Sequence, residues 1–284
     1  MTLPYDVLEK AFATARRIVD EDPAGCSKLR GIQMEGPYFS YNKRGAQNAD
    51  YLKEPDFDGF KKLFDGCGGL VKIVDIAPEL PGAAEFIQKA SKLCTVSVAH
   101  TESDYEHAKT AFAVGATHLT HLYNAMPGIN HRNPGVIPAA VETPGVRAEI
   151  ISDGYHIHPA AVRLAFSMFG GERMVLISDA LRCCGMPDGE YELGGQPVFL
   201  AGGVAKLADG TLAGSATNLF DCMVNAILFG IEEKDAVRAA TFNPACALGV
   251  QDKTGSIATG KIADFIICRS DYTGKRVFMS GVEI

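Results

Sequence analysis

The sequence predicts an α/β protein built around a parallel barrel of the (β/α)8 type. Six short apolar runs alternate with helical patterns between residues 29 and 177. The runs recur at intervals of roughly 23 to 41 residues, close to the ~31 residues per strand–helix unit of such barrels. Five of the six runs lead into a side chain that ionises or binds metal. In a parallel barrel the C-terminal strand ends meet at one face and build the active site there.

The strands and helices follow from local patterns. In chain order, the predicted strands span residues 29–34, 70–76, 93–98, 116–122, 146–151 and 174–177. The predicted helices span residues 5–20, 56–65, 82–92, 103–114, 134–142 and 159–169. In the first helix Phe12, Ala15 and Val19 recur at steps of three and four, which is typical of an amphipathic helix. Repeated units of this kind indicate a parallel sheet.

Six strands are too few for a closed barrel of eight. Only Thr2, Leu3 and Pro4 lie between Met1 and the first helix, so no strand precedes that helix in this sequence. The barrel is therefore either open or without its first two strands, and we adopt the second interpretation.

The pattern changes after Asp179. Residues 186–213 are rich in glycine, with β-like pieces at 197–201 and 203–207. Helices are predicted over 216–229 and 233–241, the second ended by Asn243 and Pro244. The segments 265–268 and 276–279 flank a turn and predict a hairpin.

Composition excludes several classes of protein. The 27 Lys and Arg against 34 Asp and Glu give a net charge of −7, and no run of basic residues suggests a nucleic-acid or anionic-membrane surface. Eight cysteines in 284 residues are too dilute for a disulfide scaffold. No apolar run approaches the ~20 residues that span a bilayer, and the N-terminus does not have the pattern of a signal peptide. We therefore expect a cytoplasmic protein that binds neither nucleic acid nor membrane.

Four residues at strand ends carry the main chemical prediction: Glu35, His100, His121 and Asp179. Each is of a type that binds a divalent metal or takes a proton from metal-bound water. They follow four different strands at the same end, so a barrel brings them together. The alternative is a set of unrelated loop residues, and the common position at strand ends argues against it.

Other histidines have simpler interpretations. In the predicted strand around residue 118, the odd spacing of His118 and His121 points them to opposite faces. His121 is nearer the C-terminal end and is the better ligand, so His118 is expected to pack against a helix. His107 lies in a helical pattern and is expected to be solvated, while His158 precedes a proline as a cap or surface group.

Arg132, Asn124 and His156 lie in neighbouring loops of the predicted barrel mouth. A guanidinium, an amide and an imidazole suit a phosphate or carboxylate, whereas the simpler interpretation is an exposed loop arginine. Cys183 and Cys184 do not predict thiol catalysis, because no base partner is suggested by spacing.

These motifs occur in a recognisable order. They are QMEGP (33–37), VAH (98–100), THLYNAMP (120–127), DGYH (153–156) and SDA (178–180). The chain resembles the N-acetylglucosamine-6-phosphate deacetylases of the amidohydrolase superfamily from about residue 29 onward. THLYNAMP is specific to that family, whereas NPA (243–245), GSI (255–257) and GKIAD (260–264) are similar to the C-terminal segment of the whole superfamily.

The resemblance implies roles for particular residues. Glu35, His100 and His121 would bind one divalent metal, most often zinc, with iron, manganese or cobalt as alternatives. Asp179 would be the catalytic acid and base. The implied substrate-binding residues are Ala46, Gln47, Asn124, Ala125, Arg132, His156, Leu212, Ala213 and Gly214. Gln47 stands where many members have a histidine, so a hydrogen-bond donor is kept but a cation is lost.

The resemblance also implies an organisation and an activity. Residues 1–250 would form the barrel, with a β-rich insertion at about 186–213, and residues 251–284 would be part of a small β domain. The activity would convert N-acetylglucosamine 6-phosphate to glucosamine 6-phosphate and acetate. A homodimer or higher homo-oligomer is expected to cover the open edges. The alternatives are another amidohydrolase acting on a cyclic amide and a non-catalytic phosphosugar-binding remnant.

Overall fold

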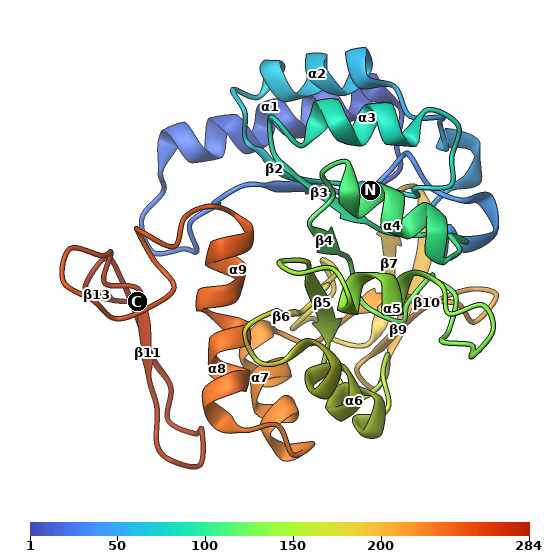
Figure 1. Cartoon of the computed structure of the whole chain (residues 1–284). Helices are drawn as coiled ribbons and strands as arrows, with labels where there is room; N and C mark the ends of the chain where they lie inside the picture. The colour runs from blue at the N-terminus through green and yellow to red at the C-terminus, as the bar shows by residue number, and fades with distance from the viewer.

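Six parallel strands form the central sheet and follow one another in chain order, β1-β2-β3-β4-β5-β6 (Figure 1). A computed structural model describes residues 1–284. The strands are β1 (Ile32–Met34), β2 (Val71–Ile76), β3 (Thr95–Val98), β4 (His118–Leu119), β5 (Arg147–Ile151) and β6 (Met174–Ile177). All six predicted strands are confirmed, and the sheet curls into a half-barrel with each neighbouring pair in parallel register.

The two faces of this sheet differ in chemistry because successive side chains of a strand point to opposite sides. One face packs in the main core with helical residues such as Phe60 and Phe86. Its strand residues are fully buried and apolar: Val74, Ile76, Val96, Val98, Leu119, Ala148 and Ile150. The alternate residues, on the other face, are buried and polar: Asp75, Ser97, His118 and Glu149. The apolar face drives folding, and the polar face lies below the strand ends that carry the predicted site.

Helices connect the strands and cover the apolar face. They are α1 (Tyr5–Glu21), α2 (Phe57–Gly66), α3 (Ala83–Ala90), α4 (Tyr105–Ala113), α5 (Val136–Val141) and α6 (Pro159–Phe169). Each agrees with a predicted helix. Short 3-10 helices, Tyr41–Lys43 and Ala49–Tyr51, interrupt the connection from β1 to α2.

Three helices follow the barrel strands: α7 (Leu219–Leu228), α8 (Glu233–Ala240) and α9 (Phe242–Ala247). The helix predicted over 233–241 ends at Ala240, before Asn243 and Pro244, as expected. These two residues lie in the first turn of α9, a helix that the sequence patterns did not predict. A proline is tolerated there, where its missing N–H has no intrahelical partner. Asn243 is buried and its amide donates to the carbonyls of Gly171 and Met174 at 2.7 Å each.

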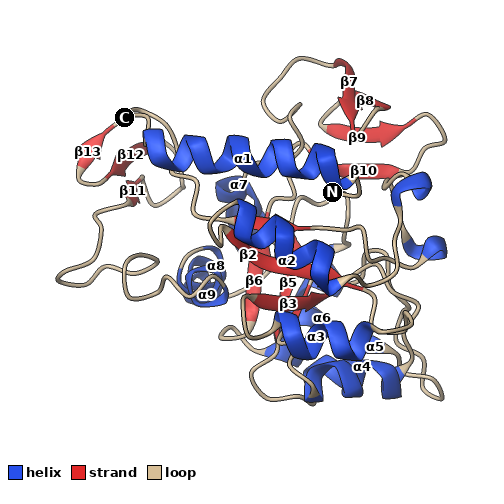
Figure 2. Cartoon of the chain, turned by 90° about the horizontal axis from the view of Figure 1, so that it is seen from above, coloured by secondary structure: helices blue, strands red, loops and turns tan.

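Two antiparallel sheets lie on opposite sides of the half-barrel (Figures 1 and 2). The first runs in the order β10-β9-β8-β7, with β7 (Gly189–Leu193), β8 (Gln196–Ala201), β9 (Val204–Leu207) and β10 (Leu212–Ser215). The second contains β11 (Phe265–Ile267), β12 (Arg276–Met279) and β13 (Val282–Glu283). Sequence patterns predicted β8, β9, β11 and β12 but not the other three strands. A parallel bridge between Ala180 and Ser215 joins the end of β6 to β10.

The chain has no helix with the length and apolar character needed to cross a membrane. Its eight cysteines are all free thiols. The adjacent pair Cys183 and Cys184 is therefore not bridged.

Candidate metal centre and active site

Glu35, His100 and His121 converge at the C-terminal ends of β1, β3 and β4. The Oε1 atom of Glu35 lies 2.9 Å from Nε2 of His100 and 3.4 Å from Nε2 of His121. The two Nε2 atoms are 3.1 Å apart. Both imidazoles are buried and Glu35 is half-buried. The predicted convergence of these three residues is therefore confirmed.

The two histidine ligands and Asp179 share an unusual backbone conformation. His100, His121 and Asp179 have φ values of 45°, 31° and 49°, in the left-handed region that non-glycine residues seldom adopt. Each lies two residues beyond the end of a barrel strand. Strained backbone of this kind persists only where the surrounding structure imposes it, and it concentrates at functional sites.

His118 corrects the argument from strand alternation. The structure does not pack it against a helix, because His118 is buried on the polar face and its Nε2 pairs with Oε1 of Glu149 at 3.0 Å. Strand β4 ends at Leu119, so alternation no longer governs His121. The other two histidines meet expectation: His107 is exposed, and His158 accepts from the N–H of Ala160 as the cap of α6.

The donor set fits a divalent cation. Nδ1 of His100 lies 2.7 Å from the carbonyl oxygen of Lys43, and because a carbonyl only accepts, that nitrogen carries the proton. The lone pair of His100 is then on Nε2, facing Glu35 and His121. Tetrahedral ligands bound at ~2.1 Å are separated by about 3.4 Å, close to the distances between these three atoms. Nδ1 of His121 is buried and has no hydrogen-bond partner, so only Nε2 of this ring faces the other two ligands.

Electrostatics distinguish the carboxyl groups of the site. Burial, together with the negative charge of Glu35, raises the pKa of Asp179 to about 7. Burial also tends to raise the pKa of Glu35, but its contacts with the imidazoles of His100 and His121 outweigh burial and hold that pKa well below its usual range. Glu35 is thus suited to bind a cation, and Asp179 to exchange a proton.

His156 is oriented by Asp153. Oδ2 of Asp153 pairs with Nδ1 of His156 at 2.7 Å, while Oδ1 accepts the backbone N–H groups of Tyr155 and His156. Both side chains are almost completely buried. Because Asp153 engages Nδ1, Nε2 remains available to a ligand.

The predicted sugar-binding residues occupy several loops. Ala46 and Gln47 are held from two sides, since Gln196 of β8 donates to the carbonyl of Ala46 at 2.8 Å and the N–H of Thr2 donates to Oε1 of Gln47 at 2.7 Å. The amide of Asn124 donates to the carbonyls of His121 and Leu122. Of the other predicted sugar-binding residues, Ala125 has a φ of 51° and Arg132 is exposed. Leu212, Ala213 and Gly214 lie in β10.

Sequence patterns gave no signal for the groups that hold the metal ligands in place. Phe39 stacks on the His100 ring with centroids 4.2 Å apart and planes inclined by 22°. Lys43 contributes a backbone carbonyl, which no residue type specifies. Glu149 reaches the N–H of His121 at 3.4 Å.

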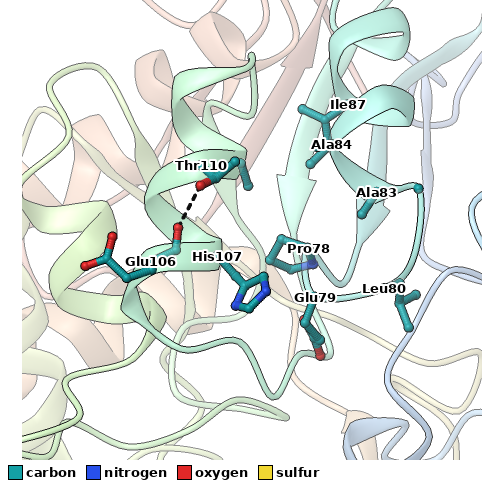
Figure 3. Close-up of a pocket in the computed structure, with 11 residues that line it drawn as sticks. Pro78, Glu79, Leu80, Ala83, Ala84, Ile87, Glu106, His107 and Thr110 are labelled. Atoms are coloured by element: carbon teal, nitrogen blue, oxygen red, sulfur yellow. Dashed lines mark hydrogen bonds between the residues drawn. The ribbon is translucent and has the colours of Figure 1, made fainter.

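A cavity of about 340 Å³ lies between α3 and α4 (Figure 3), and none of the three metal ligands lines it. Several of its polar lining groups are paired: Glu79 accepts from Thr101 and Glu102, His107 pairs with Asp104, and Thr110 donates to the carbonyl of Glu106. The group of converging metal-ligand residues lies instead at the strand ends.

The fold and the strand-end site define the class of protein. The sequence pattern of the amidohydrolase family matches residues 24–283. The chain belongs to the amidohydrolase family.

Similar proteins within that family include deacetylases of N-acetylated amino-sugar phosphates. It is 38% identical to N-acetylglucosamine-6-phosphate deacetylase of Bacillus subtilis (strain 168), covering 95% of this chain and 69% of that protein. It is 32% identical to N-acetylgalactosamine-6-phosphate deacetylase of Escherichia coli O157:H7, and the match covers 99% of this chain and 74% of that protein. The crystal structure of N-acetyl-D-glucosamine-6-phosphate deacetylase from Mycobacterium smegmatis superposes with a TM-score of 0.92 at 33% identity, covering 100% of this chain and 75% of that one. The family resemblance predicted from the motifs is confirmed.

Proposed function

We propose that this protein is a metal-dependent deacetylase that converts N-acetylglucosamine 6-phosphate to glucosamine 6-phosphate and acetate. The observation that carries the proposal is the convergence of Glu35, His100 and His121 at the strand ends. Asp179 lies at the end of the last barrel strand, and its raised pKa suits proton transfer. The named relatives act on this class of phosphosugar.

Each residue has a distinct role in the proposed reaction. Glu35, His100 and His121 would hold one divalent ion, which we propose to be zinc, with iron, manganese or cobalt as alternatives. When bound, such an ion supplies Lewis acidity toward the acetamide carbonyl and the attacking water. Asp179 accepts the proton of that water and delivers it to the leaving nitrogen. His156, whose Nδ1 is held by Asp153, would lie beside the acetamide oxygen and steady it as negative charge develops there.

The phosphosugar would be held by residues outside the metal trio. Arg132 is exposed and paired with no carboxylate, so its guanidinium is available to a phosphate. The other residues proposed to contact the phosphosugar are Asn124, Ala125, Ala46, Gln47, Leu212, Ala213 and Gly214. The Thr2 N–H occupies Oε1 of Gln47, which directs the amide N–H groups of Gln47 to the ligand.

A second candidate substrate is the galactosamine epimer. The Escherichia coli relative is named for it, and at 32% identity it is nearly as similar as the glucosamine enzymes. Comparing the kcat/KM values of the two epimers identifies the preferred one.

The test combines elemental analysis of purified protein with an acetate-release assay. We expect about one divalent ion per chain and acetate formation from the phosphorylated sugar. Phosphosugar binding without acetate release, in metal-replete protein, would instead support the non-catalytic alternative. Turnover of a cyclic amide alone would place the chain with other amidohydrolases.

We also propose the organisation in which this site works. Residues 1–250 form the barrel unit, with the β7–β10 sheet as its insertion, and residues 251–284 form part of a small β domain. The outer edge of β1 has no partner strand, so a homodimer or higher homo-oligomer is proposed to cover it. Eight free cysteines support a reducing, cytoplasmic location.

A further inference from the structure

The segment that follows β1 connects the metal ligands with the proposed sugar contacts. We call residues 36–47 the β1 loop. It carries the Lys43 carbonyl that pairs with His100, and it ends in Ala46 and Gln47. We propose that Glu102 is a positioning residue that holds the β1 loop in place, and through it both His100 and the phosphosugar contacts. This inference rests on the proposed function and names a residue outside the predicted site.

Glu102 uses both carboxylate oxygens on the β1 loop. The hydroxyl of Ser40 donates to Oε2 at 2.7 Å, and the amide of Asn42 donates to Oε2 at 3.0 Å and to Oε1 at 3.2 Å. A carboxylate oxygen only accepts, which matches the hydroxyl and amide donors that the β1 loop presents to Glu102. Hydrogen bonds to an ionised acceptor are stronger and more directional than neutral ones.

The backbone at Glu102 is itself anchored. Oε1 of Glu79, in the connection from β2 to α3, accepts the N–H of Glu102 at 2.6 Å, and Oε2 accepts the hydroxyl of Thr101. Figure 3 shows Glu79 at the edge of the cavity beside α3. Glu102 is exposed, yet it extends from backbone tied to the barrel and can restrain the loop that it contacts.

The loop transmits this restraint to His100 at three points. The N–H of Ser40 donates to the carbonyl of His100 at 3.0 Å, and Phe39 stacks on the ring. Lys43, the residue after Asn42, accepts the ring proton at Nδ1. That acceptor selects the tautomer with its lone pair on Nε2, directed at Glu35 and His121. Outer contacts of this kind orient metal-binding histidines and typically change metal affinity 10- to 100-fold when removed.

The test compares Glu102→Ala with Glu106→Ala. Glu106 lies four residues further along, in the first turn of α4, is exposed, and makes no side-chain hydrogen bond to the β1 loop. Each variant is stripped of metal and titrated with Co²⁺, recording the dissociation constant and the visible absorption spectrum of the bound ion. Then kcat and KM are measured with N-acetylglucosamine 6-phosphate after zinc loading.

For Glu102→Ala we expect a roughly tenfold or greater rise in the metal dissociation constant, an altered Co²⁺ spectrum and a raised KM. Glu106→Ala should match the wild type in all three. An unchanged Co²⁺ affinity and spectrum in Glu102→Ala would overturn the proposal. Should that variant fail to fold, Ser40→Ala removes one of the same hydrogen bonds from the other side. It must then shift the Co²⁺ affinity in the same direction, and an unshifted value rejects the proposal. Absence of acetate release by the wild type would count against the proposed function only, because the Co²⁺ measurements stand without it.

Discussion

Asp179 and the metal ligands owe their geometry to backbone conformations that cost free energy. His100, His121 and Asp179 each have a positive φ immediately beyond a barrel strand. Left-handed conformations of non-glycine residues cost on the order of 1–3 kcal/mol when strained. Neighbouring contacts offset this cost, among them the stacking of Phe39 on His100 and the hydrogen bond of Glu149 to the N–H of His121.

Asp179→Asn should abolish turnover while sparing metal binding. The amide has the shape of the carboxylate but cannot accept a proton from water. General-base catalysis contributes about 10²- to 10⁴-fold, so kcat should fall by that factor. Steady-state kinetics together with metal analysis provide the check. A variant that retains more than about a tenth of wild-type activity would remove Asp179 from the role of base.

Arg132→Ala should weaken phosphorylated substrates selectively. A hydrogen bond to a charged group contributes about 1.5–3 kcal/mol, so kcat/KM for N-acetylglucosamine 6-phosphate should fall roughly 10- to 100-fold. The kcat/KM for unphosphorylated N-acetylglucosamine should change little, because it offers no phosphate to the guanidinium. Equal losses on the two sugars would show that Arg132 does not contact the phosphate.

At the scale of elements, residues at helix starts contribute to stability, whereas residues at strand ends contribute to function. The N-terminal caps of α2, α4 and α7 are Asp56, Asp104 and Asn218, and each accepts a backbone N–H of the first turn. These residue types satisfy the orphan N–H groups that every helix start exposes. The strand ends instead present ionisable side chains. Caps therefore affect stability, and strand ends affect chemistry.

Asp56→Ala tests this division. Asp56 accepts the N–H of Gly59 at 3.0 Å, so its removal should lower the free energy of unfolding by about 1 kcal/mol. The kcat should be unaffected, since α2 packs on the outer layer with α1. Urea denaturation of this variant is compared with that of Asp58→Ala, an exposed acidic residue of the same first turn that is not the cap. If the two variants unfold at the same urea concentration, the cap contributes no specific stability.

In the whole molecule, an unpaired strand edge and exposed apolar side chains lie at the margins of its sheets. The sheet ends at β1 on one side, where no strand pairs with its outer edge. The C-terminal sheet exposes apolar side chains on its surface, with Ile266 and Ile267 exposed by 45% and 47% and Val282 by 65%. Open strand edges and contiguous apolar surface both promote association between chains.

We therefore expect the protein to self-associate at low micromolar concentration. Sedimentation velocity should give a mass of at least twice 30.3 kDa. Replacing Ile266 and Val282 with Lys should shift the distribution toward the monomer if the C-terminal sheet forms the interface. A single monomeric species with one sharp thermal transition would show that the edges are covered within one chain.

Local sequence patterns were enough to predict the order of strands and helices and the candidate residues at the strand ends. Periodicity and strand-end position are local properties, so they predicted six strands of a parallel barrel and selected Glu35, His100, His121 and Asp179. Only the tertiary structure decided how these groups are held. His118 pairs with Glu149, and Glu102 accepts hydrogen bonds from the β1 loop, because the fold brings separate elements together. The start of α9 at Phe242 likewise depends on contacts with other elements. A backbone carbonyl such as that of Lys43 is available at every residue, and only the path of the folded chain decides which one meets His100.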